Sequence, residues 1–141
     1  MNAKEWHKAK VAIALKAIIL NENGKVLVLQ RPQNDYSRPS GLDLVGGGLD
    51  SFEDPIDGIR REIKEETSLE VTDIRPIATA SFKEEDGCFT VMIAFCCTAI
   101  SNDIKLSDEH NSFQWLTVQE VLASNIPVTY KDFLKVHISP A

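Results

Sequence analysis

The chain has 141 residues, of which 43% are hydrophobic and 26% charged, and its formal net charge is −6. This is typical of a single soluble globular domain, here residues 1–141, with a core of its own. The negative charge excludes the basic field that attracts nucleic acid without specificity. No apolar run suits a signal peptide or a membrane span, so we expect a cytoplasmic protein that binds neither nucleic acid nor membrane.

Apolar, β-branched runs predict strands, and a capped periodic segment predicts one strong helix. In chain order, the expected elements are strands at 11–20, 26–29 and 42–45, a helix at 55–67, strands at 71–82, 88–100 and 113–116, and helices at 118–123 and 130–136. Only Lys16 interrupts the first apolar strand, and Asn23-Gly24 is a hairpin turn signal. Asp54 and Pro55 suit the start of the first helix. This mixture predicts an α+β fold, a mixed sheet with helices on both faces.

The helix at 55–67 carries its carboxylates as one patch. At about 100° per residue, Ile59 and Ile63 lie on the core stripe, and Glu62, Glu65 and Glu66 occupy the next sector. Three like charges at this spacing repel, and the second half of a helix disfavours anions. A divalent cation such as Mg²⁺ would reverse both effects. The patch therefore indicates a metal site, with an ordinary solvated acidic face as the alternative.

The spacing back to an upstream glycine and glutamate resembles a known motif. Gly47, Glu53 and the run Arg61-Glu62-Ile63-Lys64-Glu65-Glu66-Thr67-Ser68-Leu69 resemble the Nudix box, G-x5-E-x7-R-E-U-x-E-E-x-G-U, in which U is a bulky aliphatic residue. Eight of the nine specified positions agree over residues 47–69. The chain thus resembles the MutT-like diphosphohydrolases of the Nudix hydrolase family over roughly residues 11–121.

The resemblance implies an α/β/α sandwich, the Nudix fold. It also implies hydrolysis of a nucleoside diphosphate linked to another moiety, with Mg²⁺ or Mn²⁺ as cofactor. The implied metal ligands are Glu62, Glu65, Glu66 and the carbonyl of Gly47. Glu109 lies where relatives often bring one more acidic residue over the metal, with a solvated loop glutamate as the alternative.

The resemblance also implies the catalytic roles. Glu62 is the first candidate to orient or deprotonate the attacking water, and Glu65 belongs to the same catalytic set. Arg61 is expected to hold a neighbouring carboxylate, and Glu53 to support the junction between loop and helix. The chemistry agrees, because diphosphate cleavage needs charge neutralisation, an aligned water and a base.

Arginines and histidines outside the motif give further expectations. Arg31 and Arg38 are candidates to bind substrate phosphates, since arginine binds phosphate through two parallel hydrogen bonds. The alternative for Arg38 is an ordinary role in a polar loop. We expect His7, His110 and His137 to lie at the surface.

Two residues depart from the motif or its usual surroundings. Ser68 replaces the late glycine, which predicts a mildly strained helix end, since only glycine takes left-handed geometry freely. Phe52 replaces another common glycine and is expected to pack against the helix, with a position in the wall of the site as the alternative. The strand residues Phe82, Phe89 and Phe95 are expected in the core.

Other functions stay open at this point. A Nudix-fold module that senses a nucleotide without cutting it is the main alternative, although the full set of motif glutamates argues against it. An isopentenyl-diphosphate isomerase relative would need an active-site cysteine. Cys88, Cys96 and Cys97 cluster in one predicted strand and are expected to be reduced thiols. The partner expected is a small nucleotide-like substrate, and a homodimer stays open.

Overall fold

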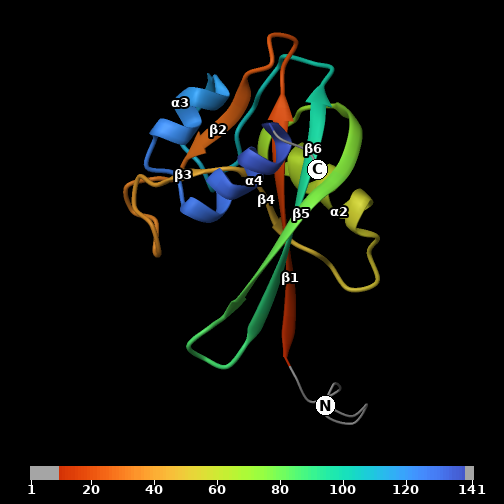
Figure 1. Ribbon diagram of the computed structural model, residues 1–141, viewed down its shortest axis with the longest axis vertical. Helices are drawn as coiled ribbons and strands as arrows, with labels where there is room; N and C mark the ends of the chain where they lie inside the picture. The colour runs from red at the N-terminus through yellow and green to blue at the C-terminus, as the bar shows by residue number, and fades with distance from the viewer. Residues whose placement is uncertain (1–9, 139–141) are drawn as a thin grey trace.

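The computed structural model describes residues 10–138. Over this range seven strands form one sheet in the order β3-β2-β1-β6-β5, with β4 paired to β1 and β7 paired to β2 (Figure 1). The strands are β1 (Val11–Leu20), β2 (Val26–Gln30), β3 (Leu42–Asp43), β4 (Val45–Gly48), β5 (Val71–Lys83), β6 (Phe89–Ala99) and β7 (Ser112–Leu116). The helices are α2 (Pro55–Thr67), α3 (Val118–Ala123) and α4 (Val128–Ile138).

Strand β1 is the centre of the sheet. It runs parallel to β6 over its whole length, from Val11 beside Phe89 to Leu20 beside Thr98. It is antiparallel to β4 and β2 on its other edge. Parallel neighbours need a long crossover connection, and α2 lies within the segment that links β1 to β6. The predicted mixed sheet is confirmed.

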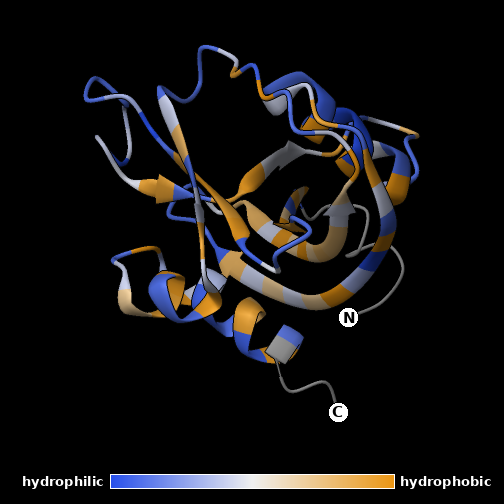
Figure 2. Cartoon of the chain, turned by 90° about the horizontal axis from the view of Figure 1, so that it is seen from above, coloured by the Kyte–Doolittle hydropathy of each residue, from blue (hydrophilic) through white to orange (hydrophobic). Residues whose placement is uncertain are grey.

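Helices cover both faces of this sheet. Helix α2 buries Ile59 and Ile63 completely in one core, whereas Phe133 and Leu134 of α4 pack in a second core on the opposite face. Seen from above, α4 leads to the C-terminus on one side of the sheet and α2 lies on the other (Figure 2). The predicted α/β/α sandwich is therefore confirmed. None of the helices between residues 10 and 138 has the length and apolar character that crossing a bilayer requires.

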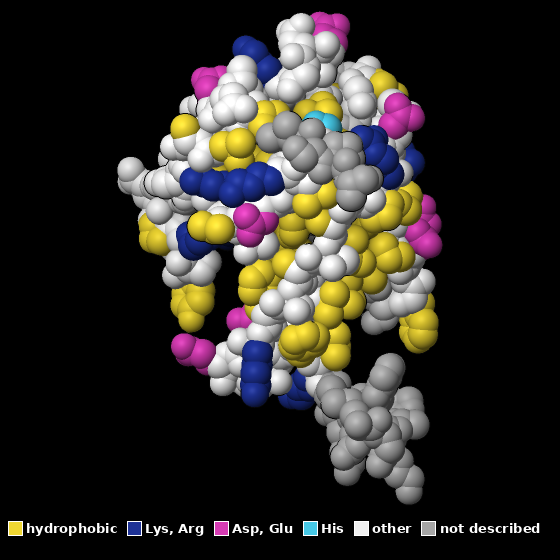
Figure 3. Space-filling model, in the orientation of Figure 1, with side chains coloured by type: hydrophobic (Ala, Val, Ile, Leu, Met, Phe, Trp, Pro, Cys, Tyr) yellow, Lys and Arg dark blue, Asp and Glu magenta, His cyan; other side chains and the backbone are white. Residues whose placement is uncertain are grey.

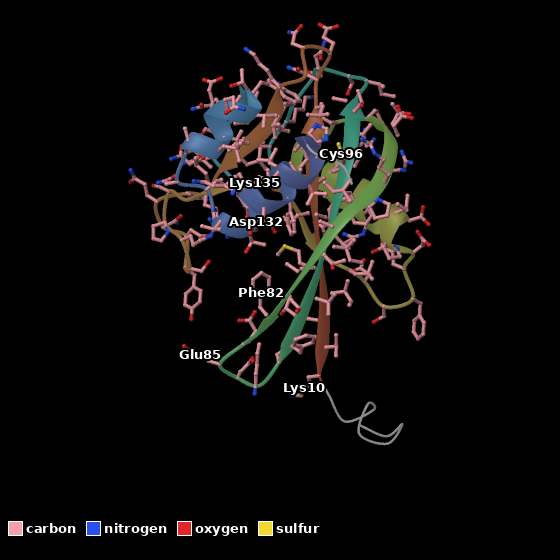
Figure 4. All side chains as sticks on the ribbon, viewed as in Figure 1. Lys10, Phe82, Glu85, Cys96, Asp132 and Lys135 are labelled. Carbon is pink, nitrogen blue, oxygen red and sulfur yellow. The ribbon has the colours of Figure 1, made fainter. Side chains whose placement is uncertain are left out.

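The ends of β1, β5 and β6 project beyond the helices (Figure 1). Phe82 lies on this projection and Glu85 at its tip (Figure 4), and hydrophobic side chains are visible over it (Figure 3). Phe82 is 36% exposed and Phe89 40%. Only Phe95 is buried as predicted, since α2, α3 and α4 cover the other end of these strands. The expectation of a core position was wrong for the other two.

Both ends of α2 have the features that its sequence predicted. Asp54 caps the helix, because its carboxylate accepts a hydrogen bond from the Ile56 amide at 2.9 Å. Ser68 ends it in the left-handed conformation, with φ 65° and ψ 8°, and its amide donates to the Lys64 carbonyl. The backbone thus keeps the geometry that glycine adopts freely, although the residue is serine.

We predict that Ser68→Gly stabilises the protein by about 0.5–1 kcal/mol, because glycine takes a positive φ without a clash at Cβ. The measurement is the midpoint of urea unfolding. Ser124→Gly is the matched control, since Ser124 also ends a helix but has φ −80°. An equal gain in both variants would show that left-handed strain at Ser68 is not the cause.

Candidate functional site

Strand β4 passes unusually close to both β1 and α2. At Gly46, φ is +153°, and a Cβ atom would lie 1.9 Å from the Leu15 carbonyl oxygen. At Gly47, a Cβ atom would lie 2.6–2.8 Å from the carboxylate atoms of Glu62. Only glycine permits the approach to the backbone at Gly46, whereas a side chain at position 47 would displace the Glu62 carboxylate. Both glycines are residues of strand β4 and lie against carboxylates of the helix.

Arg61 connects the carboxylates at the exposed edge of the site. Its Nε and Nη2 atoms donate to the two oxygens of Glu53 at 2.8 and 3.0 Å. Its Nη1 atom donates to Glu62 at 2.9 Å and to Glu65 at 3.2 Å. Hydrogen bonding to Arg61 lowers the pKa of Glu53 and keeps it ionised. Arg61 thus bridges three carboxylates, while the support role expected of Glu53 and the orienting role expected of Arg61 stay predictions.

Glu66 is a buried carboxyl, only 2% exposed. The Gly46 amide donates to its two oxygens at 3.3 and 3.4 Å. Burial raises the pKa of Glu66 to about 8, and the nearby Lys16 offsets this only in part. Burial also raises the pKa of Glu62, against the opposing effect of Arg61. Burial thus disfavours the ionised form of two carboxyls of α2, and a further positive partner would favour it.

The loop at 101–111 brings two more side chains to this helix. Its backbone amides donate to the carbonyls of Glu66 and Thr67, at 3.1 and 2.9 Å. Glu109 and His110 consequently lie beside Glu66, and the ligand atoms of these three residues are all within 4.8 Å of one another. Such a set of oxygen and nitrogen atoms can hold a divalent cation.

Asp43 is the centre of a second cluster, in which positive charge predominates. Its buried carboxylate lies 3.0 Å from Lys16 Nζ, 3.1 Å from Arg31 Nη2 and 3.0 Å from His110 Nε2. Arg38 Nη2 is slightly farther away, at 3.5 Å. Burial alone would raise the pKa of Asp43, but the His110 hydrogen bond and the charges of Lys16 and Arg31 outweigh it and hold that pKa well below its usual value.

The two clusters face a common pocket of about 490 Å³. Lys16 and Arg31 line it on the cationic side, and Gly47 and Glu109 line it on the acidic side. His110 lines it as well and contacts both clusters. The pocket can therefore accept an anionic ligand whose charge is balanced by fixed cations and by a bound metal ion.

The predicted site residues fall into two groups. Gly47, Glu109 and Arg31 line the pocket. Glu65 is more distant, since its side chain is 59% exposed and bound to Arg61. Arg38 is not among the residues that line the pocket, and its Nη1 atom donates to the Leu42 carbonyl at 2.8 Å. Substrate contact by Arg38 stays a prediction.

Two expectations about individual side chains were wrong. His110 was expected at the surface but is 6% exposed, because it pairs with the buried Asp43. Phe52 was expected to pack on the helix but is fully exposed, in a turn where its φ is 63°. His137 is half-buried, and His7 lies outside the described residues.

Sequence reasoning missed Lys16, Asp43 and His110. Two of them carry a local signal, because each is a charged residue within a short apolar strand. A charge at such a position is buried when the strand is central, and it then needs a partner. His110 carries only the weaker signal of following Glu109 directly. Nothing in the sequence pairs these three residues with one another.

Comparisons with known proteins agree with this geometry. A family model described as NUDIX domain matches residues 10–136. Nucleoside triphosphatase NudI of Salmonella paratyphi B is 25% identical over 126 residues, which cover 82% of this chain and 89% of NudI. A MutT protein from Methanosarcina mazei Go1 has a crystal structure that matches with a TM-score of 0.76 at 29% identity, covering 91% of this chain and 93% of that one.

A further solved structure shows likeness of fold alone. It is the NUDIX domain of Shewanella oneidensis NrtR complexed with ADP ribose, with a TM-score of 0.73 at 14% identity, covering 99% of this chain and all of that one. The family model covers nearly all of the described residues, and Gly47 of the Nudix box lines the pocket. The chain therefore belongs to the Nudix family of pyrophosphatase-type hydrolases.

Proposed function

We propose that this chain hydrolyses a diphosphate linkage in a small nucleotide-like substrate and that Mg²⁺ or Mn²⁺ is required. The observation that carries the proposal is that an acidic cluster and a cationic cluster lie at one and the same pocket. Lys16 and Arg31 lie on one side of it, and Glu109 with the buried Glu66 on the other. A diphosphate bridges such sites, because its oxygens bind both fixed cations and a metal ion.

The residues present suit a hard divalent cation. Glu62, Glu66 and Glu109 offer carboxylate oxygens, and Gly47 offers its carbonyl. The burial of Glu66, which is 2% exposed, is the observation that tests the fit, since burial raises the pKa of that carboxyl and a positive partner favours its ionised form. Glu65 is the most exposed member of the set. A bound cation would neutralise phosphoryl charge and lower the pKa of an attacking water.

The chain's own residues would position the water and the substrate. Glu62 lies against Gly47, half-buried, and its burial raises its pKa, so it is the first candidate for the general base. Arg61 donates hydrogen bonds to both Glu62 and Glu65 and so fixes the orientation of the two carboxylates. Lys16 and Arg31 would bind the phosphate oxygens that lie away from the cation.

The relatives suggest where to look for the substrate. NudI is named a nucleoside triphosphatase, and the NrtR domain was crystallised with ADP ribose. Nucleoside triphosphates are therefore the first class to test, followed by ADP-ribose, dinucleoside polyphosphates and nucleotide sugars. A sensor that binds without cleavage is less well supported, because Arg61 and all three motif glutamates are in place.

The isomerase alternative lacks its nucleophile. Cys96 and Cys97 are buried in β6, and Cys96 lies against the C-terminal helix (Figure 4). Cys88 is half-buried near the projecting hairpin. None of the three lines the pocket between Lys16 and Glu109. We infer that the reaction is hydrolysis by water.

We predict that Glu66→Gln and Glu65→Gln each lower kcat/KM by about 10²-fold or more, because each removes a carboxylate that holds the cation or the water. Phosphate or pyrophosphate release with Mg²⁺ over the substrate panel measures this. Glu70→Gln is the control, since Glu70 pairs with Lys64 away from the pocket and should keep full activity. Unchanged turnover in both site variants would contradict the mechanism.

We predict a pH-dependent stability gain from Glu66→Gln in EDTA. The folded pKa of Glu66 is about 8, against a usual value of 4.5. Between these two pH values the folded protein keeps a proton on Glu66 that the unfolded chain releases. The free energy of unfolding of the wild type is therefore unaffected by Glu66 below about pH 4.5 and falls as pH rises toward 8. The wild-type Tm should fall over that window by several degrees more than the variant's. Glu65→Gln should keep the wild-type slope, and parallel Tm curves for Glu66→Gln and wild type would overturn the argument.

We predict that Arg31→Gln raises KM about tenfold or more, whereas Arg38→Gln raises it less. Arg31 lines the pocket, and Arg38 is committed to the Leu42 carbonyl and to Asp43. Steady-state kinetics with the best substrate of the panel, at saturating Mg²⁺, measures both. A larger KM effect from Arg38→Gln would place the phosphates on the other side of the Asp43 cluster.

A further inference from the structure

His110 has one buried nitrogen that no described residue satisfies. Its side chain is 3% exposed. Its Nε2 atom lies 3.0 Å from Asp43 Oδ2, but its Nδ1 atom has no hydrogen-bond partner among the described residues. A buried polar atom without a partner costs free energy, so native proteins almost always give it one. The missing partner of Nδ1 therefore requires an explanation.

The contact with Asp43 determines the tautomer. The Asp43 carboxylate also receives Lys16 and Arg31 and is ionised, so it can only accept hydrogen bonds. Nε2 of His110 must then carry the hydrogen that it donates to Asp43. In the neutral imidazole, this leaves Nδ1 with a free lone pair, which is the form that binds metal ions.

The Nδ1 atom that carries this lone pair lies beside the acidic side chains of the pocket. Nδ1 lies 3.9 Å from Glu66 Oε2, which is too far for a hydrogen bond. Two ligands that each stand about 2.1 Å from one cation are separated by about 3–4.2 Å, so this distance suits a shared ion. Glu109 is the third member of the group, and the ligand atoms of the three residues all lie within 4.8 Å of one another.

We propose that His110 binds the catalytic cation through Nδ1, in a chain that runs from the Asp43 carboxylate through the imidazole to the metal. This inference rests on the metal site of the proposed function and adds a nitrogen to its oxygen ligands. A carboxylate behind a metal-bound histidine fixes the ring and makes the free nitrogen a stronger ligand.

The nitrogen ligand gives the site a metal preference. Carboxylate oxygens suit both Mn²⁺ and Mg²⁺, but imidazole is a ligand of transition-metal ions, and Mg²⁺ prefers oxygen ligands alone. The chain should therefore bind Mn²⁺ more tightly than Mg²⁺, and His110 should account for the difference. His110 acts here as a metal ligand, and Asp43 as the residue that positions it.

The test uses Mn²⁺ as the probe and pulsed electron paramagnetic resonance as the readout, which does not depend on activity. Wild-type protein with one equivalent of Mn²⁺ should show coupling to a ¹⁴N nucleus. His110→Gln should lose this coupling while it still binds Mn²⁺, with affinity reduced about tenfold or more. Its Mg²⁺ affinity, measured by calorimetry, should fall less. His137→Gln is the matched control, since His137 contacts Cys96 outside the pocket and should leave the coupling unchanged.

Each other outcome has a separate meaning. Bound Mn²⁺ without ¹⁴N coupling in the wild-type protein would overturn the role of His110 and leave the carboxylate site standing. Coupling that persists in His110→Gln would also overturn it, because the nitrogen would come from another residue. Failure of the wild-type protein to bind Mn²⁺ at all would contradict the proposed metal site itself. A wild-type spectrum without ¹⁴N coupling overturns the role of His110 even if the variant does not fold.

Discussion

The buried ionised carboxylate of Asp43 is the constraint on which the site depends. A charge in the core is tolerated only when partners surround it, and Lys16, Arg31 and His110 come from three separate segments to do so. Removing any one of them would weaken the neutralisation of a charge that is buried away from water. This requirement holds β1, the end of β2 and the loop at 101–111 around one pocket, and it leaves positive charge in excess there.

The carboxylates of α2 show the opposite situation. Glu62 and Glu66 are held where burial disfavours their ionised form. Arg61 offsets part of the repulsion between the carboxylates at the exposed edge of the site. At the buried edge, Gly46 and Gly47 bring strand β4 into close contact with its neighbours. Strain of this kind typically marks functional sites, because ligand binding relieves it.

Local signals predicted most of the fold. The bounds of α2 followed from Asp54, Pro55 and the periodicity of its isoleucines, and the structure has the same bounds. The failures occurred where packing over a distance decides the outcome. Phe82 and Phe89 were predicted to be buried because they lie in apolar strand segments. Their exposure depends instead on how far the helices extend over the sheet.

The sequence by itself determined the family and the carboxylate set, because the Nudix box lies within 23 consecutive residues whose spacing one turn and one helix preserve. Tertiary structure alone decided which charges share the pocket. Asp43 and His110 are separated by 67 positions, and Lys16 and Asp43 by 27, yet they touch. Such pairs are set by sheet register and by the demand that a buried charge be neutralised, and neither leaves a pattern that a single sequence displays.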